Sequence, residues 1–145
     1  MNRTTFPGTL DSLDDIRQLV KAQAQQAGLG KKPTYQLLLA IDEIATNIIT
    51  HGYEAAGTEG PLDVLTELAD DQLRVTLEDE AAAFDPLKHQ MPTEEFFARP
   101  LEDRPIGGMG IHLTVNGVDE FKYEYAGNRN RNIFIMKTAA PEVSG

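Results

Sequence analysis

The sequence predicts an α+β fold, a two-layer sandwich in which about three helices cover one face of a mixed, mainly antiparallel sheet. Three observations predict it: two long amphipathic helical stretches come first, pairs of alternating strands joined by short turns follow, and a glycine loop with a further helical stretch separates the pairs. The 145 residues suit one domain with one core, spanning 1–145.

The first helix is expected within residues 9–30. Asp11 or Ser12 followed by acidic residues is a capping signature at its start, and glycines at 28 and 30 mark its end. Between these ends, apolar residues recur at helical spacing: Leu13, Ile16, Leu19, Val20 and Ala24. We therefore expect an amphipathic helix that packs one face on the core.

The second helix is expected to begin near Pro33 and to end near His51 and Gly52, with an apolar face formed by Leu37, Ile41, Ile44 and Ile48. Glu43, Asn47 and His51 lie one turn apart and form a polar stripe on this helix. The stripe is either a solvated face or a site. In a site, an amide oxygen can hold a hard cation such as magnesium while a carboxylate orients or deprotonates a nucleophile.

The strands are expected in two hairpins. Residues 62–68 and 73–78 alternate around an Asp70-Asp71 turn, and the runs EFKYEYAG and RNIFIMKT alternate around Gly127-Asn128. Between the hairpins, residues 84–105 hold three prolines and many charges, which predicts a long connection with one short helical turn near 94–98. A third helix is expected within IGGMGIHLTVNGVDEF.

The glycine run from Ile106 to Ile111 opens that third helix. Glycines at a helix start let the backbone approach a phosphate closely, although a flexible hinge has the same composition. No lysine follows the last glycine, so the run is not a Walker A loop. The third glycine of a dinucleotide fingerprint is also missing.

Asp79 leaves the second strand of the first hairpin in the run EDEAAAFDP. A carboxylate in this place can accept a hydrogen bond from an exocyclic amine, as in the recognition of adenine, or can simply belong to an acidic turn.

The composition excludes several function classes. The formal net charge of −10 repels nucleic acid and anionic lipid, and a triphosphate could bind only with a cation such as magnesium. The chain has no cysteine, no apolar run long enough to span a membrane and no apolar segment of a secretory signal. We expect a cytoplasmic protein that does not bind membrane or nucleic acid.

Taken in order, EIATN, EDEAAAFDP, a charged loop and GGMGIHLT resemble the ATPase fold of the GHKL (histidine-kinase-like) proteins. The likeness is strongest to the stand-alone anti-sigma factor serine/threonine-protein kinases of the RsbW and SpoIIAB type, and it covers essentially the whole chain. It implies an ATP- and Mg²⁺-dependent kinase that binds a sigma factor, phosphorylates an anti-anti-sigma (STAS) partner on serine or threonine, and often forms a homodimer.

The resemblance also implies residue roles. Asn47 matches the magnesium ligand, Glu43 the general base one turn earlier, and Asp79 the residue that binds the adenine amine. Residues 84–104, beginning at Phe84, occupy the place of the ATP lid. The second glycine box that wraps the phosphates matches Gly107, Gly108, Met109, Gly110 and Ile111.

One position departs from the family pattern. Ala81 replaces the glycine that usually follows the adenine aspartate, and an alanine at a position of positive φ, or against the purine, would cost about 1 kcal/mol or more and crowd the base. A rival interpretation is therefore a non-catalytic partner-switching module that sequesters a sigma factor or regulator and binds nucleotide weakly. Ala81 favours the rival, and intact Glu43 and Asn47 favour the kinase.

Overall fold

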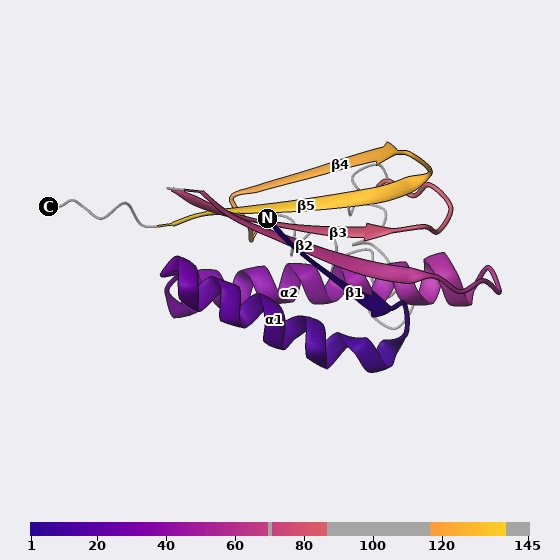
Figure 1. The fold of residues 1–145 in the computed structure, drawn as a ribbon, viewed down its shortest axis with the longest axis horizontal. Helices are drawn as coiled ribbons and strands as arrows, with labels where there is room; N and C mark the ends of the chain where they lie inside the picture. The colour runs from indigo at the N-terminus through magenta and orange to yellow at the C-terminus, as the bar shows by residue number, and fades with distance from the viewer. Residues whose placement is uncertain (70, 87–116, 139–145) are drawn as a thin grey trace, which may run out of the picture.

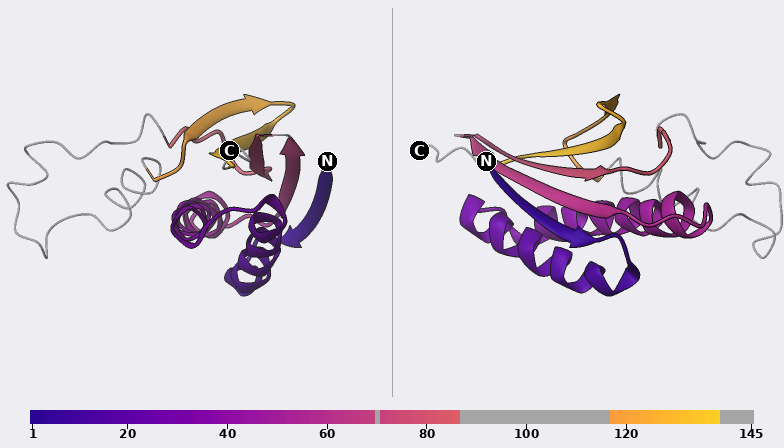
Figure 2. Two further views of the ribbon diagram at one scale, coloured as in Figure 1. Left: turned by 90° about the vertical axis from the view of Figure 1, so that its left-hand side faces the viewer. Right: turned by 45° about the vertical axis from the view of Figure 1, so that its right-hand side comes forward.

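The computed structural model describes residues 1–69, 71–86 and 117–138. A five-stranded sheet of order β1-β2-β3-β5-β4, in which every neighbouring pair is antiparallel, packs one face on two helices (Figures 1 and 2). The predicted α+β class is confirmed. The elements are β1 (Asn2–Pro7), η1 (Leu10–Ser12), α1 (Leu13–Ala27), α2 (Lys31–Asn47), η2 (Ile48–Glu54), β2 (Pro61–Ala69), β3 (Gln72–Asp79), β4 (Glu120–Ala126) and β5 (Arg129–Lys137).

Helix α1 lies where its apolar spacing predicted, and Ile16, Val20 and Ala24 are buried. The expected side-chain cap is wrong: Ser12 Oγ donates to the carbonyl of Pro7 at 2.7 Å instead of accepting from the helix, because the short 3₁₀ helix η1 already leads into α1. The end is as expected. Gly28 has a φ of 78°, and its N–H bonds Ala24 and Gln25.

Helix α2 does not end at His51 and Gly52 as predicted. After Asn47 the chain continues through η2, a π-helix in which Ala55 N–H reaches the carbonyl of Thr50, five residues earlier, at 3.0 Å. Asn47 is consequently the last residue of the regular helix. The wider turns carry the chain on to Tyr53, whose ring is buried in the core.

Strand β1 was not predicted. Its residues, NRTTFP, are mostly polar and exposed, so they show no strand periodicity. Tertiary pairing forms the strand: Phe6 pairs with Leu62, and Arg3 reaches Asp63 and Glu78 across the sheet face away from the helices.

Both predicted hairpins are confirmed. β2 pairs β3 and β4 pairs β5, and the second turn places Gly127 and Asn128 at φ values of 60° and 62°, the positive values that a tight two-residue turn requires. Residues 106–116 of the run in which the third helix was expected, the short helical turn near 94–98 and most of the proposed lid lie outside the described residues. Residues 117–119 form a turn, and Phe121 belongs to β4, as the alternation in EFKYEYAG predicted.

The core fills the layer between the helices and the sheet. It contains apolar side chains from α1, α2 and η2 on one side and from the sheet on the other, including Ile16, Val20, Leu37, Ile41, Ile44, Ile49, Leu62, Val64, Leu73, Val75, Leu77, Phe134 and Met136. Phe121 and Phe134 meet edge to face at 5.1 Å. In the part of the chain with assigned structure, no helix is long and apolar enough to cross a membrane.

An ion-pair cluster lies on the sheet face away from the helices. Glu78 accepts hydrogen bonds from Arg3 at 3.0 Å and Arg129 at 2.7 Å, and it pairs with Arg131 at 3.2 Å. Burial alone would raise the pKa of Glu78, but the bonds from Arg129 and Arg3 outweigh it and hold that pKa below its ordinary value. The cluster joins β1, β3 and β5 beside Asp79, the last residue of β3.

Candidate functional site

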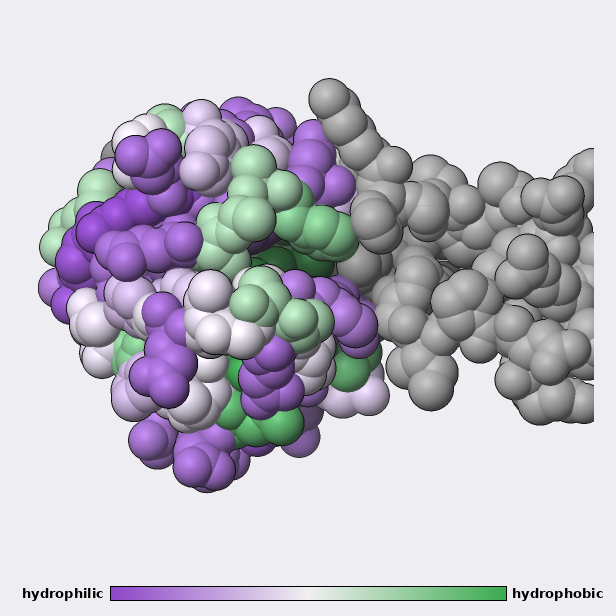
Figure 3. Space-filling model, turned by 90° about the vertical axis from the view of Figure 1, so that its right-hand side faces the viewer, coloured by the Kyte–Doolittle hydropathy of each residue, from purple (hydrophilic) through white to green (hydrophobic). Residues whose placement is uncertain are grey.

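A cavity lies between the C-terminal end of α2 and the end of β3. The space-filling view shows an apolar hollow at this end of the molecule (Figure 3). The lining residues come from four parts of the chain: Ile44, Asn47, Ile48, His51, Gly52, Ala56, Asp79, Ala81, Ala82, Ala83, Phe84, Pro86, Asn130 and Asn132. Four of the residues singled out in the sequence, Asn47, Asp79, Ala81 and Phe84, therefore meet in one place.

Asp79 lies at the base of this cavity and is 2% exposed. Its Oδ1 accepts from Ala81 N–H and from Asn130 Nδ2, each at 2.9 Å, whereas Oδ2 is buried and has no partner among the described residues. Burial raises the pKa of Asp79, and the charges of Glu78 and Glu80 add to the rise, while the bonds from Asn130 and Ala81 oppose it. One carboxylate oxygen is thus held in place, and the other can accept a hydrogen bond from a ligand.

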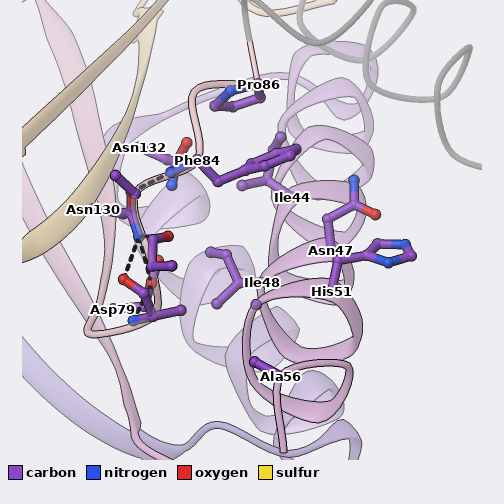
Figure 4. Close-up of a pocket in the computed structure, with 14 residues that line it drawn as sticks. Ile44, Asn47, Ile48, His51, Ala56, Asp79, Phe84, Pro86, Asn130 and Asn132 are labelled. Carbon is purple, nitrogen blue, oxygen red and sulfur yellow. Dashed lines mark hydrogen bonds between the residues drawn. The ribbon is translucent and has the colours of Figure 1, made fainter. Parts of the chain in front are cut away.

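Asn130, on β5, holds the segment that follows Asp79. Its Nδ2 donates to Asp79 and to the carbonyls of Ala81 and Ala82 at 2.9 to 3.1 Å (Figure 4). Its Oδ1 accepts from Phe84 N–H at 3.0 Å and from the Tyr123 hydroxyl. Both ends of this amide are used, so residues 79–84 are fixed against the sheet.

Tyr53 holds the same segment from the other side. The hydroxyl donates to the carbonyl of Pro61 at 2.7 Å and accepts from Glu80 N–H at 2.8 Å. Its ring lies where a Cβ on Gly8 or Gly60 would approach to between 2.7 and 2.8 Å, so glycines at both positions make room for it. The π-helix η2 places this ring, which links the helix layer to the turn after β3.

Ala81 is 7% exposed and belongs to the core cluster. Its φ is not positive, since Asn128 is the only non-glycine residue of the described chain with a positive φ. The strain considered at this position is therefore absent. Its methyl group points towards Gly52 of η2, where an added Cβ would lie 3.0 Å from it. The alanine is thus fitted to a glycine on the facing helix.

Glu43 and Asn47 are half-buried on α2. Asn47 lines the cavity, and its Nδ2 lies 3.5 Å from Glu43 Oε2, so the amide oxygen is directed away from the carboxylate. Glu43 does not line the cavity. Burial raises the pKa of Glu43, with a further rise from Asp42, against the opposing effects of Asn47 and His51. Figure 4 shows Asn47 and His51 at the rim, beyond Ile44 and Ile48.

The remaining predicted site residues, Gly107, Gly108, Met109, Gly110 and Ile111, lie outside the described residues. No group of three or more His, Asp or Glu side chains that could hold a metal occurs among residues 1–69, 71–86 and 117–138. A divalent cation at this site would therefore have to take most of its ligands from a bound phosphate group and water.

Sequence reasoning missed Tyr53, Asn130 and Asn132. Asn130 and Asn132 occupy alternate positions on the helix-facing side of β5, in line with Phe134 and Met136. Two amides in an otherwise apolar row were the available signal. Tyr53 left no comparable signal, because the segment that it holds, at Glu80, is 27 residues away in the sequence.

Comparisons with known proteins agree with this geometry. Residues 6–138 match the sequence profile of the histidine kinase-like ATPase domain. The serine-protein kinase RsbW of Bacillus cereus is 25% identical over 119 residues, which is 81% of this chain and 72% of that protein. The RsbW of Bacillus licheniformis is 26% identical over 106 residues, which is 72% of this chain and 66% of that protein.

Solved structures share the fold at lower identity. The structure of the RsbU and RsbW domains of Rv1364c from Mycobacterium tuberculosis superposes with a TM-score of 0.61 and 14% identity, over 99% of this chain and 35% of that one. The histidine kinase domain of a blue-light activated histidine kinase from Erythrobacter litoralis superposes with a TM-score of 0.54 and 16% identity, over 89% of this chain and 60% of that one. At such identities the likeness concerns the fold alone.

Proposed function

Because this chain belongs to the histidine kinase-like ATPase family, we propose that it is an anti-sigma regulatory factor and an ATP-dependent serine/threonine-protein kinase. In this proposal it sequesters a sigma factor in the cytoplasm, where it can form a homodimer, and phosphorylates an anti-anti-sigma (STAS) partner. The curated relatives named RsbW support the class of reaction. The single observation that carries nucleotide binding is the buried Oδ2 of Asp79 in the cavity, which has no partner among residues 1–69, 71–86 and 117–138.

The base of the nucleotide is proposed to lie between Ile44 and Ile48 on one side and residues 81–84 on the other, with its amine donating to Asp79 Oδ2. The apolar walls exclude water, which strengthens a hydrogen bond to a carboxylate. The residues present fit an adenine, because an amine donor would supply the partner that Asp79 Oδ2 lacks in the described part of the chain.

Asn47 is proposed to hold magnesium through its amide oxygen at the rim of the cavity. A hard oxygen ligand suits this ion, and one protein ligand is enough where phosphates and water supply the others. Bound magnesium would neutralise charge on the phosphates, which an acidic chain cannot do itself. The proposed phosphate-binding residues are those of the glycine box, 107–111.

Glu43 is proposed to act as the general base. It would accept the proton of the partner's serine or threonine hydroxyl as the oxygen of that hydroxyl bonds to the γ-phosphorus and the bond to the ADP oxygen breaks. The raised pKa of Glu43 makes it a stronger base than an exposed glutamate. Asn47, one turn away, would keep its carboxylate oriented. Phosphotransfer should accordingly slow as the pH falls through this raised pKa.

The test is transfer of label from γ-labelled ATP with magnesium to a panel of purified STAS-domain proteins. The proposal expects labelling of serine or threonine in at least one of them by the unaltered chain and none by Glu43→Gln. Asp14→Asn, an exposed position on α1, serves as the matched control and should retain full activity. Binding of a STAS protein without any transfer would favour the non-catalytic partner-switching module instead.

A further inference from the structure

Asn132 is a buried polar residue whose side-chain oxygen forms no hydrogen bond with any described residue. It lies on the helix-facing side of β5, lines the cavity and is 2% exposed. Within the described part of the chain, its Oδ1 has no partner. A buried acceptor without a partner carries the full desolvation penalty of that group, so its presence calls for a reason.

Asn130, two residues earlier on the same face, shows the contrast. Both the oxygen and the nitrogen of its amide form hydrogen bonds, to residues 79–84 and to Tyr123, so a structural role explains why this polar residue is buried. Asn132 makes none of these contacts. Further along the same face, Phe134 and Met136 are apolar and buried, as expected for the core. The row changes from apolar to polar where the cavity begins, and Figure 4 shows Asn132 on the strand side of the cavity beside Phe84.

We infer that Asn132 is a second base-reading residue, which recognises the exocyclic amine of adenine together with Asp79. The inference rests on the proposed nucleotide function. An exocyclic amine has two N–H groups. Asp79 Oδ2 takes one of them, and Asn132 Oδ1 takes the other.

This arrangement selects against guanine. Guanine presents an oxygen where adenine presents its amine, and two buried acceptor oxygens would then face a third acceptor. A site that uses polar groups to read an amine rejects an analogue lacking it strongly, because the buried groups lose their partners.

The experiment compares the unaltered chain with Asn132→Leu, which keeps the side-chain shape and removes the amide. Calorimetric titrations use magnesium-ADP and the diphosphate of purine riboside, an analogue without the amine. We expect the variant to bind ADP about tenfold more weakly, the loss of one net hydrogen bond, and to bind the analogue almost as the unaltered chain does. The ligand-free variant should also melt about 2–6 °C higher, because the unpartnered oxygen is gone.

Thr66→Val is the matched control. Thr66, on β2, is 2% exposed and does not line the cavity, and its Oγ1 has no partner among the described residues, so this change should raise the melting temperature without altering ADP affinity. Asn132→Ala provides a second variant should leucine not fit. Equal weakening of ADP and the analogue, or no weakening of ADP, would overturn the inference. Failure of the unaltered chain to bind magnesium-ADP would instead remove the proposed function itself.

Discussion

Exchanging the methyl group between Ala81 and Gly52 tests how the adenine-facing segment is held. Ala81→Gly removes a buried methyl, worth about 0.8 kcal/mol, and adds backbone freedom to the unfolded chain, worth about 0.4–1 kcal/mol. The residue is 7% exposed and its φ is not positive, so neither loss is offset by relief of strain. The expected destabilisation is about 1.5 kcal/mol.

Gly52→Ala alone places two methyl groups 3.0 Å apart. Ala81 cannot retreat readily, because its N–H is bonded to Asp79 and its carbonyl to Asn130. Overpacking of this kind costs about 1–3 kcal/mol, and the better helix propensity of alanine returns up to about 1 kcal/mol. The double variant keeps one methyl at the contact, so it should lie within about 1 kcal/mol of the original chain. The expected coupling energy is about 2 kcal/mol.

Urea unfolding of the four chains, followed by circular dichroism, gives these free energies. Titration of Ala81→Gly with magnesium-ADP is the second measurement. If the alanine crowds the purine, the glycine variant should bind ADP up to about tenfold more tightly. We expect affinity within about twofold of the original, since the methyl points towards Gly52. Additive effects on stability, or a clear gain in affinity, would refute the view that Ala81 is fitted to Gly52.

Four further predictions concern the site and its supporting charges. Asp79→Asn should weaken ADP about tenfold to a hundredfold and reduce the preference for ATP over GTP, measured by competition, because an amide donor replaces an acceptor. Asn47→Ala should abolish phosphotransfer, a loss of roughly a hundredfold or more, with an unchanged melting curve. EDTA should weaken ADP binding by roughly tenfold or more, and equal affinity with and without EDTA would contradict this. Glu78 has a lowered pKa, so its ion pairs stabilise the fold above its unfolded pKa of about 4.3, and this contribution is lost as the pH falls through the folded value. Glu78→Gln should therefore lower stability at pH 7 by roughly 1–2 kcal/mol and flatten the acid side of the stability curve.

Much of the fold follows from local sequence patterns. The helical spacing of Ile16, Val20 and Ala24 and the alternation in both hairpins mark buried faces directly, because burial follows the period of each element. β1 could not be predicted in this way, because its pairing with β2 gives it strand structure that its own polar residues do not encode. The π-helix after Asn47 was also missed: it carries Tyr53 into the core, and its residues show no pattern that distinguishes it from a regular helix.

The candidate site was partly predictable. Asn47, Asp79, Ala81 and Phe84 belong to short motifs and were found through them. The clamps formed by Asn130 and Tyr53 join segments that lie 27 to 51 residues apart, so no local pattern reveals them. The reason why an alanine is tolerated at position 81 also became clear only from the structure, because the absence of a side chain at Gly52 of η2 leaves room for its methyl group.

The most direct test of the central claim, that the cavity holds the adenine of ATP, is a chemical-shift map of the ¹⁵N-labelled chain during titration with magnesium-ADP. At 16.0 kDa the protein suits this measurement. We predict saturable shifts of the backbone amides of Gly52, Ala81 and Phe84, which line the cavity, and unchanged amides in β1 and the adjoining end of β2. No shifts at millimolar ADP, or shifts confined to β1 and the groove beside Thr9 and Gly60, would contradict the account.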